Sequence, residues 1–158
     1  MKAYAIAGLL ASLVMSACGE ALEGDPSITV DSVWVNNHQW DMASRDTLPF
    51  EADVRVFASL ATSSGTLTSF AVEVACLDND TGEQHPGGVS YESDDVSTSG
   101  MTNADEGVLR FKDGVVQTHV VVGTMASHPD SRLLRFSLFL NAGDRGIKQE
   151  LEFRLKDR

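Results

Sequence analysis

The chain has 158 residues, of which 42% are hydrophobic, and its formal net charge at pH 7 is −11. This length and composition are sufficient for one domain with its own hydrophobic core. The excess of negative charge disfavours binding to nucleic acid and to anionic lipid headgroups. We therefore expect no nucleic-acid partner, and solubility is the ordinary role of such a charge.

The first 17 residues have the parts of an export signal. Lys2 supplies a positive charge, residues 3–14 form an uncharged apolar run, and Ser16 and Ala17 are the small residues that a signal peptidase requires. The apolar run is too short to span a bilayer, which needs ~20 residues. We therefore expect a cleaved leader over residues 1–17 and no transmembrane anchor.

The leader ends in a pattern that resembles the lipobox of bacterial lipoproteins. The pattern is an aliphatic residue, two small residues and a cysteine, and Met15, Ser16, Ala17 and Cys18 occupy these places, with Met15 where leucine is usual. The resemblance implies a diacylglycerol group on Cys18 and, since Gly19 is not the inner-membrane retention aspartate, an outer-membrane address. The alternative is an ordinary secretory signal with a cysteine near its cleavage site.

Residues 18–27 are predicted to form an acidic tether between the lipid and the folded domain. Acidic residues directly after a lipid-modified cysteine resemble the surface-export signal of Bacteroidetes-type bacteria, and Glu20, Glu23 and Asp25 fit that description. A solvated linker would have the same composition. Both the cell surface and the periplasmic side therefore stay open as locations.

The rest of the chain alternates between apolar and polar residues with the period of two that is typical of β-strands. Residues 27–35 predict a strand with Ile28, Val30 and Trp34 on one face. Residues 49–59 predict a second strand that starts with Phe50 on its apolar face. Residues 66–77 predict a third strand with Phe70, Val72, Val74 and Cys76 inward. Cys76 is therefore expected to be a buried structural thiol.

Two hairpins are predicted in the C-terminal half. Asp113-Gly114 separates the β-rich segments 108–112 and 115–122, and Asp-Gly is a strong signal for a two-residue hairpin turn. Residues 133–141 and 147–156 flank a second turn that contains two glycines. These segments bring the number of predicted strands to seven.

Seven strands without a sustained helical period predict an all-β fold. We expect residues 28–158 to form a single two-layer antiparallel β-sandwich, immunoglobulin-like in architecture, with a small β-barrel as the alternative. Together with the lipobox and the acidic tether, this pattern resembles the small outer-membrane lipoproteins of Bacteroidetes-type bacteria with an immunoglobulin-like β-sandwich. The resemblance does not assign an active site to any residue of this chain.

Residues 36–48 are predicted to form a loop that could bind a ligand. The loop carries His38, Trp40, Asp41 and Arg45. An exposed tryptophan between polar side chains could stack on a sugar ring. The alternative is that Trp40 packs over the open end of the sandwich, as large aromatic side chains commonly do.

Residues 78–107 are too long for a plain hairpin loop. Asp78, Asp80 and Glu83 are hard oxygen ligands near a turn glycine, which Ca²⁺ prefers, although their spacing departs from the EF-hand pattern. The same residues are ordinary turn formers. A Ca²⁺ site here would make the melting temperature fall when EDTA is added, and an unchanged melting temperature would rule the site out.

The sequence contains no metal-binding histidine pair, nucleophile elbow or glycine-rich phosphate loop. We therefore expect a binding or accessory module without catalytic residues or a required cofactor, which contacts an envelope protein through sheet edges or end loops. Carbohydrate binding through Trp40 and the end loops is the alternative, and an enzyme is the reading with least support.

Overall fold

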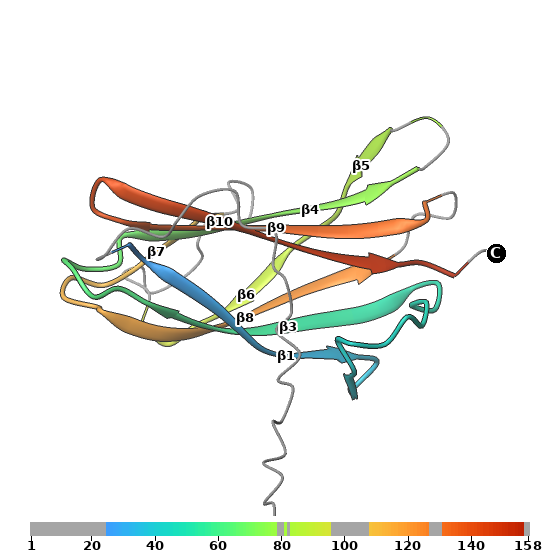
Figure 1. Ribbon diagram of the computed structural model, residues 1–158, viewed down its shortest axis with the longest axis horizontal. Helices are drawn as coiled ribbons and strands as arrows, with labels where there is room; N and C mark the ends of the chain where they lie inside the picture. Colours follow the sequence, from blue (N-terminus) through green and yellow to red (C-terminus); the bar gives the residue numbers. More distant parts are fainter. Residues whose placement is uncertain (1–24, 79–80, 82, 96–107, 127–130, 157–158) are drawn as a thin grey trace, which may run out of the picture.

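The computed structural model describes residues 25–78, 81, 83–95, 108–126 and 131–156. Over these residues the chain forms ten β-strands in two antiparallel sheets that lie one above the other (Figure 1). The strands are β1 (Ser27–Val35), β2 (His38–Trp40), β3 (Ala52–Ala61), β4 (Ser69–Leu77), β5 (Gln84–Pro86), β6 (Ser90–Glu92), β7 (Val108–Arg110), β8 (Gln117–Ala126), β9 (Leu133–Ala142) and β10 (Arg145–Arg154).

The two sheets have different strand orders. The first sheet has the order β2-β1-β3-β8-β6, and the second has the order β10-β9-β4-β5, with β7 also paired to β4. In the described part of the chain the sheets stay separate, so the predicted two-layer β-sandwich is confirmed and the alternative of a closed barrel is wrong. No helix among the described residues is long and apolar enough to cross a membrane.

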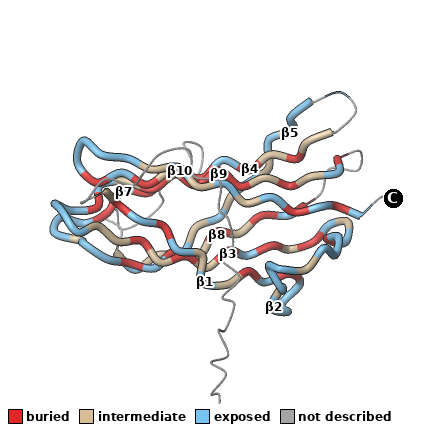
Figure 2. Tube along the Cα trace, in the orientation of Figure 1, coloured by how far each residue is buried: buried red, intermediate tan, exposed pale blue. Residues whose placement is uncertain are grey.

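The core lies between the two sheets, where buried residues alternate with half-buried or exposed ones along β3, β4 and β8 (Figure 2). Phe70 and Phe136 are fully buried, and the ring of Phe136 meets that of Phe153 edge to face with 5.9 Å between centroids. The predicted inward faces of β3 and β4 are confirmed, and the thiol of Cys76 is buried as predicted. Burial of one face of each sheet is the main source of stability in such a fold.

Strand β3 begins later than the sequence predicted. Phe50 is half-buried and lies outside the strand, and Glu51 adopts a positive φ of 57° before the strand starts at Ala52. The apolar alternation from Ala52 onward is as predicted. Alternation alone did not show that the backbone turns at Glu51.

The predicted hairpin around Asp113-Gly114 is wrong. Strand β7 pairs with β4 of the second sheet, whereas β8 pairs with β3 and β6 of the first sheet. Lys112 and Val115 still close a turn through a backbone hydrogen bond of 3.4 Å, and Gly114 has a φ of 85°. The turn therefore carries the chain from one sheet to the other, which local turn chemistry cannot distinguish from a hairpin.

The hairpin between β9 and β10 is confirmed. The turn has two residues, Gly143 and Asp144, because Ala142 pairs directly with Arg145. Gly143 has a φ of 64° at the first turn position, as a type II′ hairpin requires. The pairing then continues without a shift to Arg154 and Leu133.

Candidate functional site

The predicted ligand-binding loop begins as a hairpin. Asn36 and Asn37 form a two-residue turn with φ angles of 49° and 65°, a conformation that asparagine tolerates well, and β2 returns along β1. His38 and Trp40 therefore lie on a short edge strand and not on a loop. The side chain of His38 is exposed, whereas Trp40 is half-buried and packs against the core.

Asp41 stabilises its own turn. Its Oδ1 accepts a hydrogen bond of 2.9 Å from the backbone N–H of Ala43, and its carbonyl oxygen accepts one of 2.9 Å from Ser44. This is the ordinary behaviour of an aspartate at the start of a turn. The carboxylate oxygen that bonds Ala43 is thus engaged by the backbone.

Trp40 and Arg45 meet in one hollow, which we call the end hollow. It has a volume of about 540 Å³ and lies where residues 41–48 pass beside the end of β10, whose Glu152, Phe153 and Arg154 contribute to the lining. His38 and Asp41 do not line it. Of the four predicted ligand-binding residues, the structure therefore brings two together, beside charged groups from a distant part of the chain.

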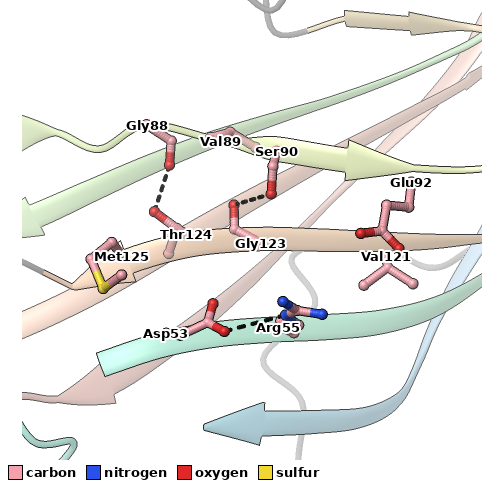
Figure 3. Close-up of a pocket in the computed structure, with 10 residues that line it drawn as sticks. All are labelled: Asp53, Arg55, Gly88, Val89, Ser90, Glu92, Val121, Gly123, Thr124 and Met125. Carbon is pink, nitrogen blue, oxygen red and sulfur yellow. Dashed lines mark hydrogen bonds and ion pairs between the residues drawn. The ribbon is translucent and has the colours of Figure 1, made fainter. Parts of the chain in front are cut away.

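A second hollow lies on the outer face of the first sheet, and we call it the face hollow (Figure 3). It has a volume of about 390 Å³ and forms because Gly123 on β8 has no side chain, while β3 and β6 carry side chains on either side. Asp53, Arg55 and Glu92 place charges around it, and Arg55 Nε lies 3.3 Å from Asp53 Oδ2. The lining of the face hollow mixes polar and apolar side chains.

Trp34 lies on this same outer face, which the sequence did not predict. The register of β1 against β3 shifts between Val30 and Ser32, so the bulge at Asp31 reverses which residues point inward. Val33 and Val35 are buried, whereas Trp34 is 37% exposed. The change from apolar residues at even positions to valines at odd positions was the signal that could have revealed the bulge.

A serine, a histidine and an aspartate also meet on the outer face. Ser59 Oγ lies 2.6 Å from Asp31 Oδ2 and 3.0 Å from His119 Nδ1. The order differs from that of a hydrolase triad, in which the aspartate orients the histidine. Here Asp31 accepts the hydroxyl hydrogen bond itself, so the arrangement holds β1, β3 and β8 together at this point.

The predicted Ca²⁺ ligands lie around the turn between β4 and β5. Asp78 and Glu83 face each other across it, with the N–H of Asp78 donating to the carbonyl oxygen of Glu83 at 3.0 Å, and Asp80 lies outside the described residues. Among the residues that the structure describes, no three histidine, cysteine, aspartate or glutamate side chains converge as a metal site would need. Cys18 also lies outside the described residues.

The solved structures that match this chain are similar to it only at low sequence identity. The reeler domain of human F-spondin matches with a TM-score of 0.47 and 15% identity over 93% of this chain and 99% of that one. A second crystal structure of the same domain matches with a TM-score of 0.45 and 16% identity over 90% of this chain and 100% of that one. A FixG-related protein from Vibrio parahaemolyticus gives a TM-score of 0.40, with 13% identity over 84% of this chain and 97% of that one.

No curated protein matches the sequence. A family model does match, and it covers residues 18–155, which is nearly all of the chain from the predicted lipid-bearing cysteine onward. The chain therefore belongs to the family described as domain of unknown function DUF5035.

Proposed function

We propose that this protein is a lipoprotein of the bacterial outer membrane, anchored through Cys18, that acts as a non-enzymatic binding or accessory module for a protein partner. The lipobox pattern supports the anchor. The observation that carries the binding role is the outer edge of β10. This ten-residue strand ends the second sheet, and no described strand pairs with its outer side.

The backbone groups on this edge can be assigned from the hairpin. Because Arg145 closes a two-residue turn, its backbone groups face β9, and the backbone groups of the next residue face outward. The same alternation makes Arg154 face outward, and its carbonyl oxygen does accept a bond of 2.7 Å from Leu48. As far as the described residues show, the groups left open for a partner strand belong to Gly146, Lys148, Glu150 and Glu152.

Charged side chains restrict what can pair with this edge. Lys148 Nζ lies 2.6 Å from Glu150 Oε1, and Arg135 Nη2 lies 2.6 Å from Glu152 Oε1. The hydrogen bond from Lys148 is the largest cause that lowers the pKa of Glu150, so this carboxylate is charged near neutral pH. Charges on an edge strand oppose unspecific pairing, while an open backbone edge permits strand addition by a complementary partner.

The proposed anchor would hold this edge close to the membrane. Arg145, at the start of β10, lies 3.4 Å from Asp25 through an Nη1–Oδ1 ion pair. The seven residues that follow Cys18, up to Asp25, can span roughly 25 Å when extended. A tethered module of this kind could meet other envelope proteins without leaving the outer membrane.

The test is native co-purification of the full-length protein, tagged at Arg158 and extracted from membranes in mild detergent. Lys148→Pro removes an outward N–H and places a ring on the edge, which an edge strand tolerates. Lys148→Ala is the matched control, since it removes the same charge and keeps the N–H. We expect a stoichiometric protein partner with the wild type, reduced but still measurable recovery of it with the alanine variant, and its loss with the proline variant. Recovery of the tagged chain alone, with neither another protein nor a co-expressed untagged copy of this chain, would contradict the proposal.

Carbohydrate binding is the second candidate function. The end hollow favours it, because Trp40 offers part of an indole ring beside the charged groups of Arg45, Glu152 and Arg154. Retention of the protein on immobilised glycans, lost in Arg45→Ala and kept in His38→Ala, would support this candidate. His38 is the control because it lies on the same hairpin outside the hollow.

A further inference from the structure

We infer that the partner at the open edge of β10 is a second copy of this chain, paired antiparallel about a two-fold axis at Gln149. This inference rests on the proposed use of the edge and names its partner. It joins the second sheets of two copies into one continuous sheet. The argument depends on where the edge is open, which charges then face each other, and which apolar side chains meet.

The open part of the edge is centred on Gln149. It is bounded at one end by the Gly143-Asp144 turn and at the other by Leu48, whose N–H already bonds the carbonyl oxygen of Arg154. Gly146 and Glu152 are thus the outermost residues with open backbone groups. Two copies can use all of these groups only when Gly146 of one faces Glu152 of the other, which puts the two-fold axis at Gln149.

This register is the one in which the charges are complementary. With the axis at Gln149, Lys148 of each copy faces Glu150 of the other, so four alternating charges form a closed ring with the existing Lys148–Glu150 pairs. Opposite charges directly across two strands are stabilising and like charges are destabilising. A shift of two residues in one direction would put Lys148 opposite Lys148. A shift in the other direction would put Glu150 opposite Glu150 between two Lys148–Glu152 pairs, so each shift introduces a like-charge pair.

The apolar side chains agree with the same register. Ile147 and Leu151 lie on the inner face of β10 and are half-buried against the core of their own copy. The axis at Gln149 places Ile147 of one copy opposite Leu151 of the other. The apolar edges of the two sandwiches would therefore meet on one side of the joined sheet, and the charge ring would lie on the other.

Such a pairing closes on itself. An isologous contact uses the same edge on both copies, so it gives a dimer and leaves no β10 edge for further addition. The charges on the edge therefore favour the register with the axis at Gln149 and disfavour the shifted registers. Tethering both copies to one membrane would raise their effective concentration and favour the dimer.

Cysteine cross-linking tests the register in the full-length protein, extracted in mild detergent and oxidised. Two Gln149 residues at the axis form a non-hydrogen-bonded pair with Cα atoms ~4.5 Å apart, within disulfide range. Two Lys148 residues would lie roughly 9 Å apart, which is too far. We expect Gln149→Cys to give a disulfide-linked dimer on a non-reducing gel and Lys148→Cys to give little. Equal yields, or none from Gln149→Cys, would overturn the inference.

A charge exchange tests the contact itself. Lys148→Glu would place like charges in both cross-strand pairs and should lower the dimer affinity by about tenfold or more. Adding Glu150→Lys restores opposite charges in the exchanged order, so the double variant should dimerise again. Unfolding midpoints show whether each variant still folds. A double variant that folds and stays monomeric would contradict the inference.

The two proposals fail in different ways. If the co-purified partner is another protein whose binding is lost in Lys148→Pro, the dimer inference is wrong and the proposed function stands. If no partner of any kind depends on the edge, both are wrong.

Discussion

The hydroxyl group of Tyr91 joins the two sheets of the sandwich. It accepts a hydrogen bond of 3.1 Å from the N–H of Val72 and donates one of 3.3 Å to the carbonyl oxygen of Val72. Val72 lies on β4 between the stretches that pair with β7 and β5, so no strand of the described chain pairs with these backbone groups on that side. A side chain from the edge of the first sheet thus completes the edge of the second.

We expect Tyr91→Phe to lower the free energy of unfolding by about 1–3 kcal/mol, because it leaves two partly buried backbone groups without this partner. The ring and its edge-to-face contact with Phe70 would remain. Urea denaturation of both proteins measures the difference. A change below about 0.5 kcal/mol would mean that water replaces the hydroxyl group.

The same hydroxyl group makes stability depend on alkaline pH. Burial raises the pKa of Tyr91 above its usual value of 10.0, and the hydrogen bond from Val72 opposes this only in part. The folded protein therefore holds the proton more tightly than the unfolded chain does. This contribution is complete below pH 10 and is lost as the pH rises above it. The wild type should lose more stability than Tyr91→Phe between about pH 9 and pH 11.

The two tryptophans differ in what holds them. Trp40 packs against the core, whereas Trp34 is exposed, with its indole N–H donating to Ser32 Oγ at 3.2 Å. We expect Trp40→Ala to lower the free energy of unfolding by about 1 kcal/mol or more, and Trp34→Ala to change it by less than about 0.5 kcal/mol. Thermal midpoints of the two variants give the comparison. An unchanged thermal midpoint in Trp40→Ala would show that Trp40 contributes little to the core, so that its side chain would be available to bind a ligand.

At the scale of the elements, the segment from β5 to β6 crosses between the sheets. Strand β5 pairs with β4, strand β6 pairs with β8, and only three residues separate them. The N–H of Gly87 donates to the carbonyl oxygen of Val74 at 2.8 Å, so the crossing backbone lies directly against β4. The crossing closes one side of the sandwich, opposite the side on which β10 lies.

Gly87→Ala should destabilise the protein by about 1–3 kcal/mol, because the added Cβ would lie 2.9 Å from Val74 Cγ1. Gly88→Ala is the matched control, since a Cβ at that position meets nothing within 4 Å. The two variants differ by one position in the same crossing. Equal stabilities in chemical denaturation would show that β4 yields to the methyl group.

For the molecule as a whole, the described chain begins beside the start of β10, the strand with the open edge. The Asp25–Arg145 ion pair connects the start of the described chain to the start of that strand. A lipid group on Cys18 would therefore keep β10 within reach of the membrane. The binding role and the anchor are separable, because the folded domain begins after the tether.

Cys18→Ser should abolish membrane attachment, because a serine cannot carry the thioether-linked lipid. When cells that express the full chain are fractionated, the variant should be found in the soluble fraction or as a precursor that keeps its leader. Cys76→Ser is the control for loss of a cysteine, and the buried position of Cys76 predicts reduced stability with attachment intact. Attachment that survives in Cys18→Ser would refute the lipoprotein assignment.

The long strands and the two-layer fold could be predicted from the sequence alone. Strands β3, β4, β9 and β10 were predicted because burial of one sheet face produces an alternation that is local to each strand. The turn at Gly143 was predictable for the same reason, since turn chemistry depends on adjacent residues. The family resemblance rested on Cys18, which lies outside the described residues.

The pairing of the segments, in contrast, is visible only in the folded protein. The partners of β7 and β8, the bulge at Asp31 and the exchange of roles between Trp34 and Trp40 depend on contacts between residues that are far apart in the chain. The end hollow, the face hollow and the open edge follow from strand order, which no local pattern encodes. Alternation shows that a strand has a buried face, but the neighbours of that strand decide which of its edges stays open.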